Sequence, residues 1–432
     1  MKTISTMALA ALLTGSAALP FAATAAGKKE QPPPDSPTNF VLSQQVRASA
    51  AAATLALKAN DLAGAEGAIS TIERSASNDS ERFIGRTLRV RLLSVSPATV
   101  QSQTAMVKPM TELIADPRTS KDDASRYNYT LGDFAYARKD YVKAVQFYRQ
   151  AREDGIRDDE LNLQIVRANM EAGQVSAGAA ELDSMITAQI AAGKKPPESW
   201  YRFAAQRLRL KKAPETAAWT GKWLGAYGTK ANWHDAIAFN GFKDEDETKL
   251  TPTERKDRDT RFVDLFRLMR ATRSLAGQKE YLEYARRANN LGLKDEVKAV
   301  IEEGRASGAI PAKDPESIRL LGAAPAKGKK AAAPAAGPSE AAARKATDGT
   351  QAAQVGDASI GRGAYAKAVE MYDLALEKTV KDADDVRLHR GIALALAGDK
   401  ERARADLATV TNGPDSDTAT LWKIWLDNPP AA

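Results

Sequence analysis

The chain offers few residues of the types that carry out acid–base, nucleophilic or metal chemistry. It has no cysteine and only two histidines, His234 and His389. The absence of cysteine excludes disulfides, thiolate metal sites and thiol catalysis. The histidines lie in separate segments and neither belongs to a His-Glu-x-x-His pattern, so we predict structural roles for both rather than metal binding or assistance to a nucleophile.

Two short segments are superficially similar to ligand-binding loops. From Gly322 to Lys330 the spacing approaches that of a phosphate-binding loop, but five residues separate Gly322 from Gly328, one too many, and Lys330 occupies the Ser/Thr position. The acidic run from Asp244 to Glu247 lacks the glycine and the closing glutamate of a calcium loop. Carboxylates are abundant, yet no motif singles out a catalytic pair. The sequence therefore predicts no enzymatic activity, no cofactor and no metal site.

The N-terminus has the features of a targeting segment. Lys2 provides a positive charge, residues 7–23 form an apolar run that Pro20 interrupts, and a small-residue cleavage site follows. An interrupted run of this length is too short for a membrane anchor. We therefore predict a cleaved signal peptide over residues 1–26 and a disordered, proline-rich leader over residues 27–39.

Composition also limits the location and the partners. No later segment is apolar enough to span a bilayer, and an exported, cysteine-free, helical chain is typical of the bacterial periplasm. The formal net charge of +7 is a mild excess for 432 residues and is spread along the chain. We therefore expect a periplasmic protein whose partner is not a nucleic acid.

The stretch from Tyr127 to Glu153 contains two amphipathic helical patterns joined by a short turn. Small residues stand where the helices must approach closely and bulky residues stand between them: Gly132, Ala144 and Ala151, with Leu131, Tyr136, Tyr141 and Tyr148. This pattern resembles the tetratricopeptide repeat, a helix–turn–helix unit of about 34 residues. Asn128 replaces the early Trp of that family, Ala135 the first-helix Tyr, and Ile156 the closing Pro.

Further copies of this unit follow at near-regular intervals. Gly173 lies 34 residues after Lys139, and Gly398 lies 35 residues after Gly363. The predicted turns contain Asn60, Lys139, Gly173, Lys212, Gly292, Gly363 and Gly398. A repeating interval of this length is typical of stacked helical units, and with the resemblance it implies an all-α solenoid of helix–turn–helix repeats.

Changes in composition divide the expected solenoid into two arrays. We predict an N-terminal array over residues 40–308, a flexible linker over 309–346 and a C-terminal array over 347–428. The linker contains an Ala-, Pro-, Gly- and Lys-rich run with little to bury. The apolar segment from Thr418 to Leu426 is expected to cap the last repeat.

The resemblance implies that the first helix of each repeat lines a groove for a peptide or protein segment. The residues expected to face that groove are Arg126, Tyr129, Asp133, Tyr136, Leu163, Arg167, Met170, Tyr201 and Arg209. Tyrosine, methionine, leucine and arginine suit adaptable contacts with a polypeptide. The alternative for the tyrosines is packing between helices. The paired Lys and Asn with which some members of the family hold a terminal carboxylate are not reproduced.

These features favour a non-catalytic periplasmic scaffold or adaptor that binds segments of envelope proteins. Two other hypotheses remain open at this stage. A chaperone for exported polypeptides would bind many unfolded segments weakly. A glycan-active envelope enzyme would carry an acid on its helical superhelix, and its mark would be a glutamate with a raised pKa in a cleft.

Overall fold

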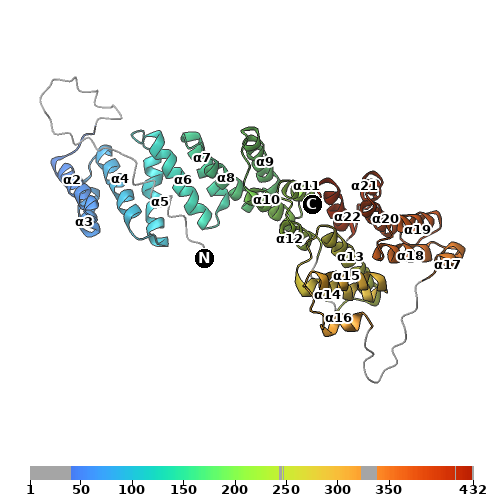
Figure 1. Cartoon of the computed structure of the whole chain (residues 1–432). Coiled ribbons are helices and arrows are strands. Elements are labelled where there is room, and N and C mark those ends of the chain that lie inside the picture. The colour runs from blue at the N-terminus through green and yellow to red at the C-terminus, as the bar shows by residue number, and fades with distance from the viewer. Residues whose placement is uncertain (1–39, 243–245, 247, 323–337, 414, 431–432) are drawn as a thin grey trace. The chain divides into compact units, whose positions relative to one another are not determined.

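The computed structural model describes residues 40–242, 246, 248–322, 338–413 and 415–430, and it is all-helical there, without strands (Figure 1). Consecutive helices pack as antiparallel pairs, which confirms the predicted all-α class and its helix–turn–helix architecture. The predicted signal peptide, the leader and most of the Ala/Pro/Lys run lie outside the described residues. Among the described helices, none combines the length and the apolar character needed to cross a membrane.

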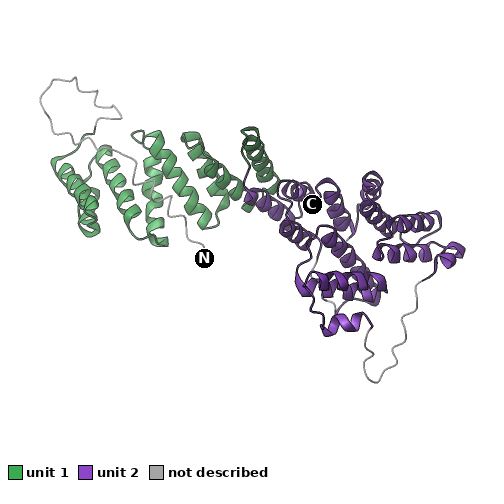
Figure 2. Cartoon of the chain, in the orientation of Figure 1, with its two compact units in different colours: residues 1–195 green, residues 196–432 purple. Residues whose placement is uncertain are grey.

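The chain divides into two compact units, residues 1–195 and residues 196–432 (Figure 2). The helices of unit 1 are α2 (Gln44–Lys58), α3 (Leu62–Ser75), α4 (Asp79–Val95), α5 (Val100–Ile114), α6 (Lys121–Ala137), α7 (Tyr141–Asp154), α8 (Asp159–Glu171) and α9 (Val175–Ala191). They form the pairs α2–α3, α4–α5, α6–α7 and α8–α9. Each pair also packs against the next, as in a stack of repeats.

Unit 2 contains the remaining helices. They are α10 (Glu198–Leu210), α11 (Thr216–Ala226), α12 (Lys230–Asn240), α13 (Pro252–Ala271), α14 (Gly277–Asn290), α15 (Lys294–Ala306), α16 (Pro315–Leu320), α17 (Glu340–Lys345), α18 (Thr350–Gly361), α19 (Tyr365–Glu377), α20 (Ala383–Ala397), α21 (Lys400–Thr409) and α22 (Asp415–Asp427). The pairs here are α10–α11, α14–α15, α18–α19 and α20–α21.

The division between the units falls at a different point from the boundary expected on composition. Residues 196–308, expected in the first array, share a compact unit with residues 347–428, because α15 packs against α18 and α13 packs against α22. The expected linker also contains two short helices, α16 and α17. Composition indicates where the chain has few apolar side chains to bury. It does not show which helices before that segment pack against helices after it.

Seven of the turns between helices share one backbone feature, while the turn between α4 and α5 lacks it. Each predicted turn contains a residue with positive φ, and these are Asn60 (56°), Lys139 (63°), Gly173 (93°), Lys212 (53°), Gly292 (78°), Gly363 (72°) and Gly398 (90°). A left-handed residue ends one helix and reverses the chain within a few residues. The repeated turn geometry is the direct structural counterpart of the near-regular spacing in the sequence.

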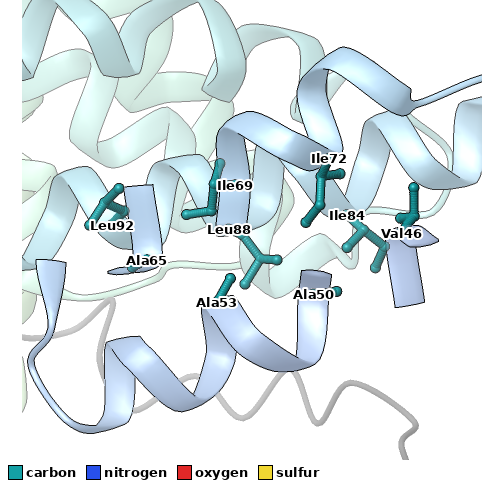
Figure 3. Close-up of a cluster of buried hydrophobic side chains, with 9 residues drawn as sticks. All are labelled: Val46, Ala50, Ala53, Ala65, Ile69, Ile72, Ile84, Leu88 and Leu92. Atoms are coloured by element: carbon teal, nitrogen blue, oxygen red, sulfur yellow. The ribbon is translucent and has the colours of Figure 1, made fainter. Parts of the chain in front are cut away.

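Small residues allow the helices of a pair to approach closely. In the first pair, Ala50 and Ala53 of α2 and Ala65 of α3 are fully buried beside Leu88 of α4 (Figure 3). The complete buried cluster is Val46, Ala50, Ala53, Ala65, Ile69, Ile72, Ile84, Leu88 and Leu92. Its members recur three or four residues apart along each helix, so one stripe per helix forms the core.

In both units a glycine of the first helix of a pair packs against a tyrosine ring of the second helix. At Gly132 an added Cβ would lie 2.5 Å from Cδ1 of Tyr148, and at Gly356 it would lie 2.6 Å from Cε1 of Tyr372. Both tyrosines are buried on the second helix of their pair, and each donates a hydrogen bond to the aspartate that follows the glycine. The ring can therefore fill the space between the helices only where the facing residue has no side chain.

The C-terminal helix α22 packs against more than the preceding pair. It contacts α20 and α21, and also α11 and α13 from the earlier part of unit 2. Trp422 is fully buried, and Leu421 and Leu426 are nearly so. The apolar face expected to cap the last repeat therefore also ties the two ends of unit 2 together.

The close helix approach in unit 1 leads to a first prediction. Gly132→Ala should lower the free energy of unfolding of unit 1 by about 1–3 kcal/mol, because the new methyl group meets the trapped ring of Tyr148. Gly67→Ala is the matched control, since Gly67 lies within α3 and an added Cβ there meets nothing within 4 Å. The control should raise stability by about 0.5–1 kcal/mol.

Urea unfolding separates the two units. All six tryptophans lie between Trp200 and Trp425, in unit 2, so tryptophan fluorescence reports that unit while far-ultraviolet circular dichroism reports both. Equal stability of the two glycine variants would contradict the close-packing account.

Candidate functional site

Four of the residues expected to face a groove lie along one side of α6. Arg126, Tyr129, Asp133 and Tyr136 are all half-buried. The Tyr129 ring packs edge-on against the ring of Tyr148, with centroids 5.8 Å apart. The Tyr136 ring packs in the same way against Tyr141, the first residue of α7. Each tyrosine therefore contributes to the contact between the two helices and keeps part of its surface exposed.

Three other predicted groove residues are core residues instead. Leu163 and Met170 on α8 are 6% and 1% exposed, and Tyr201 on α10 is 4% exposed. Met170 fills the space beside Gly178 of α9, while Tyr201 packs against the ring of Tyr227. The expectation that they line an open groove is corrected, because first-helix positions alternate between the groove and the contact with the second helix.

The two remaining predicted residues are half-buried arginines with partners. Arg167 on α8 lies 3.9 Å from the Glu160 carboxylate, and Arg209 on α10 donates a hydrogen bond of 3.1 Å to the carbonyl of Asn240. The charge of Arg167 acts on the Tyr129 hydroxyl, so the two side chains lie near each other. We call the half-buried residues Arg126, Tyr129, Asp133 and Tyr136 of α6, with Arg167 of α8, the α6–α8 face. Arg209 lies in unit 2 and holds α10 to the end of α12.

Asp133 is the titratable centre of the α6–α8 face. The Tyr148 hydroxyl donates to its Oδ1 over 2.7 Å. Burial raises the pKa of Asp133 to about 6 although this hydrogen bond opposes the rise, and the charge of Glu160 adds to it. Asp133 consequently changes charge in the mildly acidic range rather than near pH 4.

The equivalent aspartate of unit 2 has a different neighbour. Tyr372 donates to Oδ1 of Asp357 over 2.7 Å, but the same oxygen also lies 2.9 Å from Nδ1 of His389 on α20. Burial would raise the pKa of Asp357, yet the charge and hydrogen bond of His389 lower it. The same glycine–aspartate–tyrosine arrangement thus carries a carboxyl whose pKa is raised in unit 1 and lowered in unit 2.

His389 lies at the centre of a buried charge network. Its Nε2 is 3.1 Å from Oδ2 of Asp264 on α13 and 3.7 Å from Asp385 on its own helix. Burial alone would lower the pKa of His389, but Asp264, Asp385 and Asp357 together raise it well above the ordinary value. Burial raises the pKa of Asp385 to about 6. The predicted structural role of His389 therefore fits a cation held among three carboxylates.

Arg267 extends this network to α15. Its guanidinium is 4% exposed and contacts Asp264 at 2.9 Å and Glu296 at 2.7 Å. Tyr284 of α14 donates to the same Glu296 over 2.5 Å. The network joins α13, α14 and α15 to α18 and α20, which explains why these helices share one compact unit. Charged residues at Asp264 and Arg267 within the apolar run of α13 are the sequence signal that could have indicated a buried pair.

The other histidine also contacts carboxylates. Nε2 of His234 lies 2.6 Å from Glu280 of α14, and its pKa is raised: burial opposes the rise, and Glu280 drives it. Among the described residues, no group of three or more His, Cys, Asp or Glu side chains has the arrangement of a metal site.

The mark expected of a glycan-active enzyme is a glutamate with a raised pKa. The glutamates of the described segments with a resolved shift all have lowered pKa values, and they are Glu66, Glu81, Glu254, Glu340 and Glu370. Glu81 is the most strongly affected, since hydrogen bonds from Ser77 and Ser43 lower its pKa to about 2. These glutamates bind backbone amides, hydroxyls or basic side chains and hold the fold together.

A groove of about 620 Å³ lies over α3, α4 and α5 of unit 1. We call it the α3–α5 groove. Its apolar lining comes from all three helices and is Ile72, Ala76, Gly85, Leu93, Ala105 and Pro109. Charged side chains form its rim: Arg86 pairs with Glu112 at 2.7 Å, and Arg89 pairs with Glu73 at 2.6 Å. Sequence reasoning missed this groove because its lining comes from two successive repeats rather than from one.

The raised pKa of Asp133 leads to a second prediction. The folded carboxyl keeps its proton up to about pH 6, whereas the unfolded one loses it near pH 4, so this group stabilises unit 1 at low pH and the contribution is lost as pH rises through 6. Asp133→Asn should remove up to about 3 kcal/mol of this pH dependence. The measurement is urea unfolding followed by circular dichroism from pH 4 to pH 7. Parallel curves for the two proteins would contradict the prediction.

A third prediction concerns His389. His389→Gln should destabilise unit 2 by about 3–5 kcal/mol, because it leaves neighbouring carboxylates buried without their cation. The contribution of His389 is fully present below pH 6.5 and is lost as pH rises through its raised folded pKa. Tryptophan fluorescence should show the loss in unit 2, with Lys381→Gln, an exposed site on the same unit, as the control. Similar stability of both variants would refute a structural role for the network.

Comparison with known proteins adds little beyond this architecture. No family model and no curated protein matches the chain. One solved structure to which it is similar is the "Crystal Structure of Rap Protein Complexed with Competence and Sporulation Factor", at 12% identity, with 88% of this chain and 100% of that chain covered and a TM-score of 0.24. A likeness at that TM-score carries no argument. The architecture is that of consecutive packed helix pairs, like those of helical repeat proteins.

Proposed function

We propose that this protein is a non-catalytic scaffold or adaptor of the tetratricopeptide type, which binds protein or peptide segments in the bacterial envelope. The single observation that carries the proposal is the α3–α5 groove, a depression of about 620 Å³ with an apolar floor and a charged rim on a stack of helix pairs. Its periplasmic location is part of the proposal and is supported by the sequence of residues 1–26.

The groove has the properties that helix-in-groove recognition needs. Its floor combines the buried Ile72 with the half-buried Leu93 and Pro109, so an amphipathic segment could bury its apolar side there. The guanidinium groups on its rim are held in ion pairs across neighbouring helices. A rim fixed in this way loses little conformational entropy when a partner binds.

The α6–α8 face supplies a second contact surface in the same unit. Tyr129 and Tyr136 offer aromatic area with few rotatable bonds, and Arg167 offers a planar cation. A segment that crosses this face would meet Asp133 between the two tyrosines. Its binding would then depend on whether this carboxyl is ionised, with a midpoint near pH 6.

The groove gives a fourth prediction. A photo-crosslinking phenylalanine derivative in place of Ala105, an exposed residue of the groove, should crosslink one recurrent partner in intact cells. The same derivative in place of Ala51, an exposed residue of α2 that is not part of the groove lining, should give no such product. Fractionation of the same cells checks the periplasmic location.

The outcomes separate the competing functions. A discrete product from position 105 alone supports a scaffold with a dominant partner. A broad set of products would favour a chaperone. Equal products from both positions, or none from either, would falsify the assignment of the groove as the binding surface.

A further inference from the structure

We infer that unit 2 carries a second binding site, a cation-lined cleft that takes a polypeptide segment with acidic side chains. The site is independent of the α3–α5 groove, because every residue that forms it lies in unit 2. Its outer part is a cavity of about 530 Å³ at the start of α12, the end of α13, the start of α14 and the end of α15. Its inner part is a cavity of about 370 Å³ that reaches α18, α19 and α20.

The two cavities share a wall. Arg270, Arg273 and Glu303 line both of them. A ligand longer than a single side chain could therefore occupy both parts. We call the combined feature the unit 2 cleft.

The outer cavity carries more positive than negative charge. Lys230, Arg270 and Arg273 line it, and Glu303 is its one lining carboxylate. Glu303 is already engaged, since it accepts from Nε of Arg270 over 2.6 Å and from the Tyr281 hydroxyl over 3.3 Å. Within the described part of the chain, neither Lys230 nor Arg273 has an ion-pair partner. Two cations therefore remain available for an anionic ligand.

The position of Arg273 is fixed by the turn that carries it. The residue has φ +53° directly after α13, between Thr272 and Ser274, whose side chains are buried and hydrogen-bonded to each other over 2.8 Å. The backbone amide of Ser274 also donates to the carbonyl of Met269 over 2.8 Å. The exposed guanidinium thus projects from a rigid backbone, which lowers the entropy lost on binding.

The start of α14 adds to the positive potential. Gly277, the first residue of the helix, lines the outer cavity, and its N-cap Ala276 provides no side-chain acceptor. Glu280 accepts from the amide of Ala276 and contacts His234, so part of this charge is compensated. The remaining amides at the helix start reinforce the preference for an anion that the two free cations establish.

The inner cavity favours a polypeptide over a small anion. The half-buried Tyr365 and Leu396 supply aromatic and apolar surface there beside the buried Ile360, while the Arg267 guanidinium at its base is held by Glu296 and Asp264. A ligand that places a carboxylate side chain in the basic outer cavity and an apolar side chain in the inner cavity would match the lining of both. An acidic segment with interspersed apolar residues is the partner whose chemistry fits both parts.

The test is binding of a fluorescein-labelled peptide of alternating Glu and Leu, with both ends blocked, to the full-length protein by fluorescence anisotropy. The same peptide with Gln in place of Glu should bind at least about tenfold more weakly, because the free cations then lose their partners. Arg273→Glu and Lys230→Glu should each weaken binding of the acidic peptide by at least about tenfold. Lys381→Glu, an exposed lysine of the same unit outside the cleft, should change it less than about twofold.

Three results would overturn the inference. Equal binding of the Glu and Gln peptides would show that charge is not recognised, and an equal loss with Lys381→Glu would show that only net charge matters. Binding of a polyuronate that depends on Arg273, with no binding of the peptide, would assign the cleft to an anionic glycan instead. Tryptophan fluorescence confirms that each variant remains folded, since all tryptophans lie in unit 2. The crosslinks at position 105 are read separately, so failure of this inference and failure of the proposed function are distinguishable.

Discussion

The structure depends on the close approach of two helices within each pair, which requires a small residue opposite a large one. In unit 1, Ala144 and Ala151 are fully buried and the Tyr148 ring lies against Gly132. A smaller partner would lose van der Waals contact at this distance, and a larger one would clash. The left-handed turn at Lys139 is the other half of the same constraint, because it reverses the chain within a few residues and brings the two helices side by side.

Unit 2 combines this apolar packing with a buried ionic network. His389, Arg267 and their carboxylate partners join helices from both sides of the expected linker. Desolvation makes such a network costly unless each charge is paired, and its members here are paired several times over. Apolar stripes can slide past one another, whereas an arginine and a histidine with fixed partners allow one register. We regard the network as the element that specifies how α13–α15 meet α18–α20.

The two proposed binding surfaces differ in chemistry because the basic side chains of one are in ion pairs, whereas, among the described residues, two basic side chains of the other are not. Over the α3–α5 groove, arginines on the rim are neutralised by neighbouring glutamates, so apolar contact dominates. In the unit 2 cleft, Lys230 and Arg273 remain available and electrostatic attraction dominates. A scaffold with one surface of each kind could hold two different segments, and salt would weaken only the second.

The sequence by itself determined the helical class, the paired units and their turns. Local causes suffice there: a small–large pattern three or four residues apart, and a turn at Asn60, Lys139 or Gly173 that repeats at a near-regular interval. The half-buried positions of Tyr129 and Asp133 followed from the same helical period. Tertiary structure alone decided that Leu163, Met170 and Tyr201 are buried and that α13–α15 share a unit with α18–α22. It also decided that a groove forms over α3–α5 and a cleft among helices that are distant in the sequence. The physical reason is that a helical period shows which residues share a face, while the neighbour that covers this face comes from a distant part of the chain.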